Sequence, residues 1–111
     1  MELKRVVVTG LGALTPVGNN VAETWDNLVK GVSGAGPITH FDASKFKTHF
    51  ACEVKNFNGT DYIDRKELRK MDLYTQYAIA AAKEAVEDSG MDLEKEDLNR
   101  IGVIYGVGIG G

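Results

Sequence analysis

The chain has 111 residues, enough for one small domain, and its 43% hydrophobic and 26% charged residues are ordinary for a globular protein. The formal net charge of −3 argues against a general nucleic-acid binder, because such proteins carry an excess of Lys and Arg. No apolar run is long enough to span a bilayer, and the single cysteine, Cys52, rules out an internal disulfide framework. Since residues 1–5 also lack the apolar core of a secretory signal, we expect a cytoplasmic protein.

The first third of the chain predicts a strand, a loop and a helix. Arg5–Thr9 is a β-branched run that predicts a buried strand of a parallel sheet, and residues 10–18 form a loop. Asn20, with Glu23 three residues on, predicts a helix N-cap, and Gly31 predicts the end of that helix. One helix face, expected to pack on a core, carries apolar residues at helical spacing: Val21, Trp25, Leu28, Val29 and Val32.

The middle of the chain predicts one more strand and two helices. Phe50–Val54 is the candidate strand within an irregular segment. Asp64 is expected to cap a short helix that ends near Lys70, and Asp72 a longer one that stops at Gly90. The inward face of the longer helix is rich in alanine, so another backbone can approach it closely. Its residues are Tyr74, Tyr77, Ala78, Ala81, Ala82, Ala85 and Val86.

The last segment, Ile101–Val107, predicts a second buried strand, and residues 108–111 are a glycine-rich turn. The order of strands and helices predicts an α/β fold. Two or three parallel strands make an incomplete sheet, because both faces and both edges need covering. We therefore expect either a piece of a longer polypeptide or a partner chain that supplies the missing strands.

The turn at Gly10 and Gly12 has some features of a dinucleotide-binding fingerprint. That fingerprint needs a third glycine and an immediate helix, but Thr15 stands at the third position and Pro16 follows. A tight turn that lets the backbone pass close to its neighbours is the better interpretation.

Cys52 is a poor candidate nucleophile, because it lies in a strand-like run beside the carboxylate of Glu53. An incidental, part-buried cysteine is favoured. His40 and His49 do not combine with Cys52 in the spacing of a zinc site, so no metal is expected.

Three cations, Lys66, Arg69 and Lys70, share one face of the short helix. From the residues alone, a solvated helix face is favoured. The alternative is a docking site for an acidic macromolecule, steered by long-range attraction. The glycine-rich end also allows two interpretations. Ile109 lies either in a flexible loop that follows the strand, or next to a ligand or another chain.

Short groups of residues follow one another in a specific order and spacing. They are Arg5-Val6-Val7-Val8-Thr9-Gly10-Leu11-Gly12, Thr15-Pro16-Val17-Gly18-Asn19, Thr24-Trp25, Leu28, Gly31, Ser33-Gly34, His40-Phe41-Asp42, Arg65-Lys66-Glu67, Arg69-Lys70-Met71-Asp72, Gln76-Tyr77, Asp88-Ser89-Gly90, Arg100-Ile101-Gly102 and Gly108-Ile109-Gly110-Gly111. No single group is decisive. Together they resemble the start of the β-ketoacyl-ACP synthase II class, the chain-elongating condensing enzymes of the thiolase-like superfamily. The resemblance covers essentially all 111 residues.

This resemblance implies a thiolase-like fold with αβαβα layers and a homodimer. Residues 1–111 would be the N-terminal part of the synthase N-terminal domain. The family joins an acyl-enzyme to malonyl-ACP by decarboxylative Claisen condensation, without a cofactor. Its catalytic cysteine, two histidines and lysine lie beyond Gly111, so no catalytic residue is assigned and the chain alone is expected to be inactive.

The resemblance also implies two sites within the chain. Lys66, Arg69 and Lys70 match basic residues that face the acyl carrier protein (ACP), and Ile109 matches an isoleucine that lines the acyl pocket. A non-catalytic docking or assembly module is the alternative function.

Overall fold

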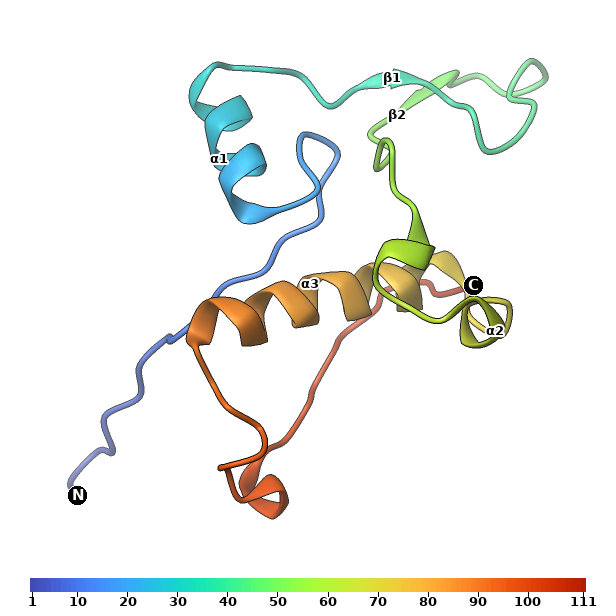
Figure 1. Cartoon of the computed structure of the whole chain (residues 1–111). Coiled ribbons are helices and arrows are strands. Elements are labelled where there is room, and N and C mark those ends of the chain that lie inside the picture. Colours follow the sequence, from blue (N-terminus) through green and yellow to red (C-terminus); the bar gives the residue numbers. More distant parts are fainter. The chain divides into compact units, whose positions relative to one another are not determined.

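The computed structural model describes all 111 residues, which divide into two units: Met1–Gly12 with Gly59–Gly111, and Ala13–Asn58. In chain order the elements are α1 (Val21–Val29), β1 (Gly36–Pro37), β2 (Phe50–Ala51), η1 (Gly59–Asp61), α2 (Arg65–Leu68), α3 (Leu73–Ser89) and η2 (Leu98–Arg100), most of which are labelled in Figure 1. None of the helices combines the length and the apolarity needed to cross a bilayer.

In the second unit, α1 begins with the predicted cap. The side chain of Asn20 accepts a hydrogen bond from the backbone N–H of Glu23 at 2.8 Å, and the Glu23 carboxylate accepts one from the N–H of Asn19 at 3.0 Å. The reciprocal pattern is that of a capping box, shifted by one residue on the return bond. Gly31 follows the helix with a φ of 70°, which confirms the predicted end.

The predicted apolar face of α1 is not covered within its unit. Trp25 is 67% exposed, Leu28, Val29 and Val32 are exposed as well, and only Val21 is half-buried. The helix instead contacts the 15–18 loop through a polar edge, which consists of Thr24 and Asn27. The expectation of a packed apolar face was wrong for this chain, because the unit contains no element that lies over that face.

The one sheet of the structure is a two-residue antiparallel pair. Gly36 pairs with Ala51 and Pro37 with Phe50. The predicted strand at Phe50–Val54 is therefore shortened to its first two residues, and its partner is a segment for which no strand was expected.

In the first unit, α3 is the longest helix, and Gly90 ends it in the left-handed conformation with a φ of 68°, as predicted. The predicted inward face is only partly right. Ala80 is the most deeply buried apolar residue, at 4% exposure, although it was not on the predicted face. Tyr77, Ala78, Ala81 and Ala85 are half-buried, whereas Tyr74, Ala82 and Val86 are exposed.

The buried face of α3 is set by the backbone of residues 10–12. A Cβ atom on Gly12 would collide with the carbonyl oxygen of Ala81, and one on Gly10 would collide with that of Ala85. The backbone N–H of Leu11 donates to the Asp88 carboxylate at 2.9 Å. This confirms both the close backbone approach expected for the glycines and the role expected for the alanine-rich face.

The strands predicted at Arg5–Thr9 and Ile101–Val107 do not form. Both segments lack regular structure, and their apolar side chains lie in solvent; Ile104 is 98% exposed. A strand is stable only when neighbouring strands take its backbone hydrogen bonds and other layers cover its side chains. No segment of this chain pairs with either run, so the predicted parallel sheet is absent and the structure contains helices with one small antiparallel sheet.

The area of exposed surface shows how little apolar core the chain has by itself. A folded monomer of this mass has about 6,000 Å² of accessible surface. This chain exposes 9309 Å², and the only buried apolar residues are Ala43 and Ala80. The burial that normally offsets chain entropy is therefore small.

Candidate functional site: a basic surface on α2

The basic surface consists of Lys66, Arg69 and Lys70, which are all exposed. The carboxylate of Asp64 caps α2 by accepting the backbone N–H of Lys66 at 2.8 Å, as the sequence predicted. The helix is shorter than predicted, because Arg69 is already its C-cap. The N–H of Lys70 still donates to the carbonyl of Glu67 at 3.0 Å, which continues the turn as far as Lys70.

Glu67 partly neutralises this surface. Its carboxylate lies 3.0 Å from Nζ of Lys70, and the two side chains are 55% and 70% exposed. An exposed ion pair of this kind contributes little free energy and is screened by salt. A negatively charged partner can therefore compete with Glu67 for Lys70.

The opposite side of α2 faces its own unit. Leu68 and Met71 are half-buried, and Gly59 of η1 is buried. Figure 1 shows α2 near the end at which α3 begins, and η1 is in contact with both helices. The cations thus lie on a corner whose inner side is packed.

The other candidate in this unit, Ile109, is 98% exposed and lies in a bend of the glycine-rich end. Gly110 passes the ring of Tyr74, since a Cβ added there would lie 3.0 Å from two of its ring carbons. At this exposure Ile109 is not enclosed by the rest of the chain, so its assignment to an acyl pocket stays a prediction.

In the second unit, Cys52 is a free thiol and is exposed, not part-buried as expected. Nε2 of His40 is 3.9 Å from Oε1 of Glu53, and a ring nitrogen of His49 is 2.6 Å from the carbonyl oxygen of Phe46. No group of three or more His, Cys, Asp or Glu residues in the structure could hold a metal ion. Neither histidine is brought into a catalytic arrangement with Cys52.

Glu53 has a structural role that the sequence did not reveal. Its carboxylate accepts the hydroxyl of Thr39 at 2.7 Å, the N–H of Thr39 at 3.0 Å and the N–H of His40 at 3.3 Å. The Thr39 hydroxyl, followed by the backbone N–H groups and the nearby His40, holds the pKa of Glu53 below its ordinary value. These bonds join the segment after β1 to the segment after β2.

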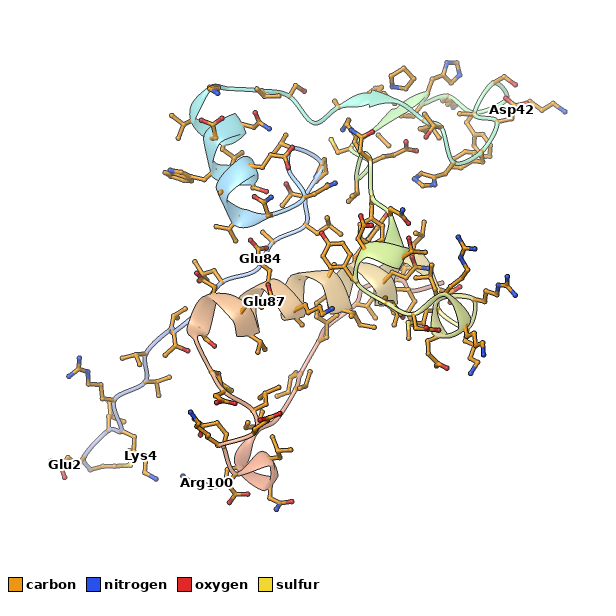
Figure 2. The ribbon with its side chains drawn as sticks, in the orientation of Figure 1. Glu2, Lys4, Asp42, Glu84, Glu87 and Arg100 are labelled. Atoms are coloured by element: carbon orange, nitrogen blue, oxygen red, sulfur yellow. The ribbon has the colours of Figure 1, made fainter.

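Asp42 lies at the far end of the connection between β1 and β2, as Figure 2 shows. Its carboxylate accepts the backbone N–H of Ser44 at 3.0 Å, and bonds from Ser44 lower its pKa. This is an Asx turn, which orders the tip locally and implies no chemistry.

Lys55 is a second residue whose role the sequence did not reveal. Its ammonium group donates to the carbonyl oxygens of Pro16 at 3.0 Å, Gly34 at 2.7 Å and Glu53 at 3.0 Å. It borders a pocket of about 220 Å³ beside the 15–19 loop. Because two of the three carbonyls, those of Pro16 and Gly34, belong to distant segments, Lys55 serves as a clamp within the second unit.

The comparisons with known proteins agree with one another. The family described as "Beta-ketoacyl synthase, N-terminal domain" matches residues 3–111. The chain is 55% identical over 108 residues to 3-oxoacyl-[acyl-carrier-protein] synthase 2 of Staphylococcus aureus (strain COL), covering 97% of this chain and 26% of that protein. It is 51% identical over 111 residues to the synthase of the same name from Vibrio harveyi, covering 100% of this chain and 27% of that protein. The chain thus spans about a quarter of the length of these relatives.

Two solved structures resemble the fold. The ishigamide ketosynthase/chain length factor matches with a TM-score of 0.73 and 41% identity, over 79% of this chain and 22% of that one. A type II PKS acyl-carrier protein in complex with its ketosynthase, bound to the hexaketide, matches with a TM-score of 0.68 and 31% identity, over 88% and 24%. Since the family match extends over nearly the whole chain, the protein belongs to the family of β-ketoacyl synthase N-terminal domains.

Proposed function

We propose that this chain is the N-terminal part of a chain-elongating β-ketoacyl-ACP synthase II of fatty acid biosynthesis. The observation that carries the proposal is the 55% identity to 3-oxoacyl-[acyl-carrier-protein] synthase 2 over 97% of the chain. In this proposal residues 1–111 begin the synthase N-terminal domain of a thiolase-like fold. The exposed runs Arg5–Thr9 and Ile101–Val107 become strands when the remainder of that domain pairs with them, which accounts for their β-branched composition.

The proposed reaction is decarboxylative Claisen condensation. A cysteine thiolate holds the acyl group as a thioester, malonyl-ACP loses CO₂, and the resulting enolate attacks the acyl carbonyl and expels the thiolate. We assign no group of this chain to these steps, since Cys52 is exposed directly after β2 and beside Glu53, and not at the N-terminus of a helix. We therefore assign it no catalytic residue, cofactor or metal, and expect residues 1–111 alone to be inactive.

The proposed role of the basic surface is to dock the acyl carrier protein. Lys66, Arg69 and Lys70 are exposed on a protein whose net charge is −3, so they form a local region of positive potential. One structural relative was solved as an acyl-carrier protein in complex with its ketosynthase. A carrier with acidic side chains would be steered to this surface and would compete with Glu67 for Lys70.

Further parts of the proposal concern the pocket and the assembly. Ile109 lines the acyl pocket once other residues surround it, and the neighbouring glycines allow the backbone to approach a ligand closely. The exposed apolar surface of the chain is consistent with extensive burial in the complete enzyme and with a homodimer. The proposed location is the cytoplasm.

The docking proposal is tested by measuring the affinity of a full-length synthase carrying this segment for holo-ACP. We expect Lys66→Glu and Arg69→Glu each to weaken binding about tenfold or more, because each replaces an attraction with a repulsion. The effect should shrink as salt rises. Lys45→Glu is the matched control, since Lys45 is an exposed cation of the other unit. Equal affinity in all variants would contradict the docking role.

A non-catalytic docking or assembly module is the alternative function. It is favoured by one observation, that the basic surface lies within a single unit together with the residues that pack behind it. Residues 1–111 and a full-length protein that carries them can each be mixed with holo-ACP and, separately, supplied with malonyl-ACP and acyl-ACP. Binding without condensation by every longer form of the protein would favour the module over the enzyme.

A further inference from the structure

The position of α2, the helix that carries the basic surface, depends on contacts with the rest of its unit. Four residues make a single turn, and so short a helix is unstable unless tertiary contacts fix it. Its N-terminus is capped by Asp64, but that bond is local and does not tie α2 to the rest of the unit. The placement of the cations therefore depends on the contacts that fix the connection between α2 and α3.

Gln76 provides such a contact. Its Nε2 donates to the backbone carbonyl of Met71 at 3.1 Å in a part-buried position, five residues back and on the other side of the corner. Asp72, the N-cap of α3, makes no side-chain capping bond, so this amide is the side-chain tie at the start of α3. Loss of the donor would leave the Met71 carbonyl partly buried without this partner.

The other end of the same amide faces η1. A Cβ atom added to Gly59 would lie 2.6 Å from Oε1 of Gln76 and 2.5 Å from Cδ1 of Leu68. The buried glycine thus makes room for the amide and for the one half-buried side chain of α2 itself. One side chain of α3 therefore lies at the junction of η1, α2 and the α2–α3 corner.

We propose that Gln76 is a positioning residue for carrier docking, which holds α2 in the place from which Lys66, Arg69 and Lys70 meet the carrier. This inference rests on the proposed docking function. Gln76 itself is half-buried and carries no charge. Its effect on binding comes only through the location of the cations.

The mechanism predicts which rate constant changes. Charge steers the encounter, so the association rate and its salt dependence follow the charges of this surface, which Gln76→Met leaves unchanged. Close contacts govern dissociation, and a mobile α2 would hold the carrier less well. Charge variants should therefore slow association, whereas Gln76 variants should speed dissociation.

The experiment measures association and dissociation of holo-ACP with the full-length synthase, for Gln76→Met, Gln76→Glu, Arg69→Glu and the α3 surface control Glu87→Met. Gln76→Met keeps the length of the side chain but not the donor. We expect its dissociation rate to rise about three- to tenfold, as for the loss of one part-buried hydrogen bond. Its association rate should stay near that of the wild type, and Glu87→Met should match the wild type in both.

Gln76→Glu separates positioning from general loss of structure. The introduced carboxylate cannot donate to the Met71 carbonyl, but the protonated carboxyl can. The ratio of its dissociation rate to that of the wild type should therefore fall toward one as pH is lowered from 7 to 4, through the ordinary pKa of a Glu carboxyl, while the ratio for Gln76→Met stays constant. Faster dissociation in both variants without this recovery would overturn the positioning role.

The remaining outcomes separate the two proposals. If Arg69→Glu weakens binding and Gln76→Met leaves dissociation unchanged, docking stands and the role of Gln76 is wrong. If Arg69→Glu has no effect either, the docking function itself fails, and the positioning role fails with it.

Discussion

The segment 13–35 and the segment 101–109 are both largely without regular structure outside α1, yet they differ in how they are held. In the first, side chains reach distant backbone groups: Asn27 donates to the Val17 carbonyl at 2.6 Å, and Lys55 binds the carbonyls of Pro16 and Gly34. In the second, apolar side chains such as Ile104 lie in solvent.

The difference lies in where the partners are. A loop whose polar groups find donors and acceptors within its own unit is ordered by that unit, because each bond satisfies a backbone group. An apolar strand needs a ladder and a covering layer, which this chain does not provide. The comparison separates a region whose polar groups are bonded within its own unit from one in which the backbone has no pairing strand and the apolar side chains lie in solvent.

The largest effect expected from this comparison concerns residues 1–111 as an isolated chain. Because only Ala43 and Ala80 are buried apolar residues, we expect no sharp cooperative melt by circular dichroism and strong binding of an apolar dye. A full-length synthase should melt cooperatively and bind little dye. A cooperative transition of the isolated monomer at low concentration would contradict the idea that its strands need partners.

The next effect concerns the part of the first unit that is packed. Gly12→Ala places a Cβ atom against the Ala81 carbonyl, a backbone group that cannot rotate away. We expect the free energy of unfolding of a full-length synthase to fall by about 3 kcal/mol in denaturant titration. Gly36→Ala is the matched control, because a Cβ atom there meets nothing within 4 Å. Equal stabilities of the two variants would contradict the close packing.

A smaller effect is expected at the clamp of the second unit. Lys55→Met removes three bonds to carbonyl oxygens and should lower the free energy of unfolding by about 1 to 2 kcal/mol, discounted because the residue is exposed. Lys55→Arg should not restore it, since a planar guanidinium does not fit three converging carbonyls as an ammonium does. Full recovery with arginine would show that charge alone matters.

The smallest effect is the titration of Glu53. Its lowered pKa means that its contribution to folding is present above its ordinary value of 4.5 and is lost as pH falls through the lowered folded value. NMR titration of the side-chain carboxyl should report a value below 4.5, and Thr39→Val should move it back toward 4.5. An unchanged titration in the variant would mean that the Thr39 hydroxyl is not the main cause.

Local features of the sequence determined the helices and their ends. The Asn20 and Asp64 caps, the stops at Gly31 and Gly90, and the close approach of Gly10 and Gly12 were all predicted and confirmed. Each of these features depends on interactions over a few residues or on the absence of a side chain. The identity of neighbouring residues in the sequence is therefore enough to predict the feature. The three cations of the basic surface were predicted to share one helix face, and the structure shows that each of them is exposed.

The tertiary structure decided what depends on distant partners. The clamp of Lys55, the bonds of Glu53 and the tie of Gln76 join residues to backbone groups whose proximity no local pattern indicates. The predicted strands at Arg5–Thr9 and Ile101–Val107 were wrong for the same reason: their composition favours a buried strand, but burial requires neighbouring segments, and no segment of this chain pairs with them. Capping acts along a few consecutive residues, whereas packing and pairing act between segments brought together in space.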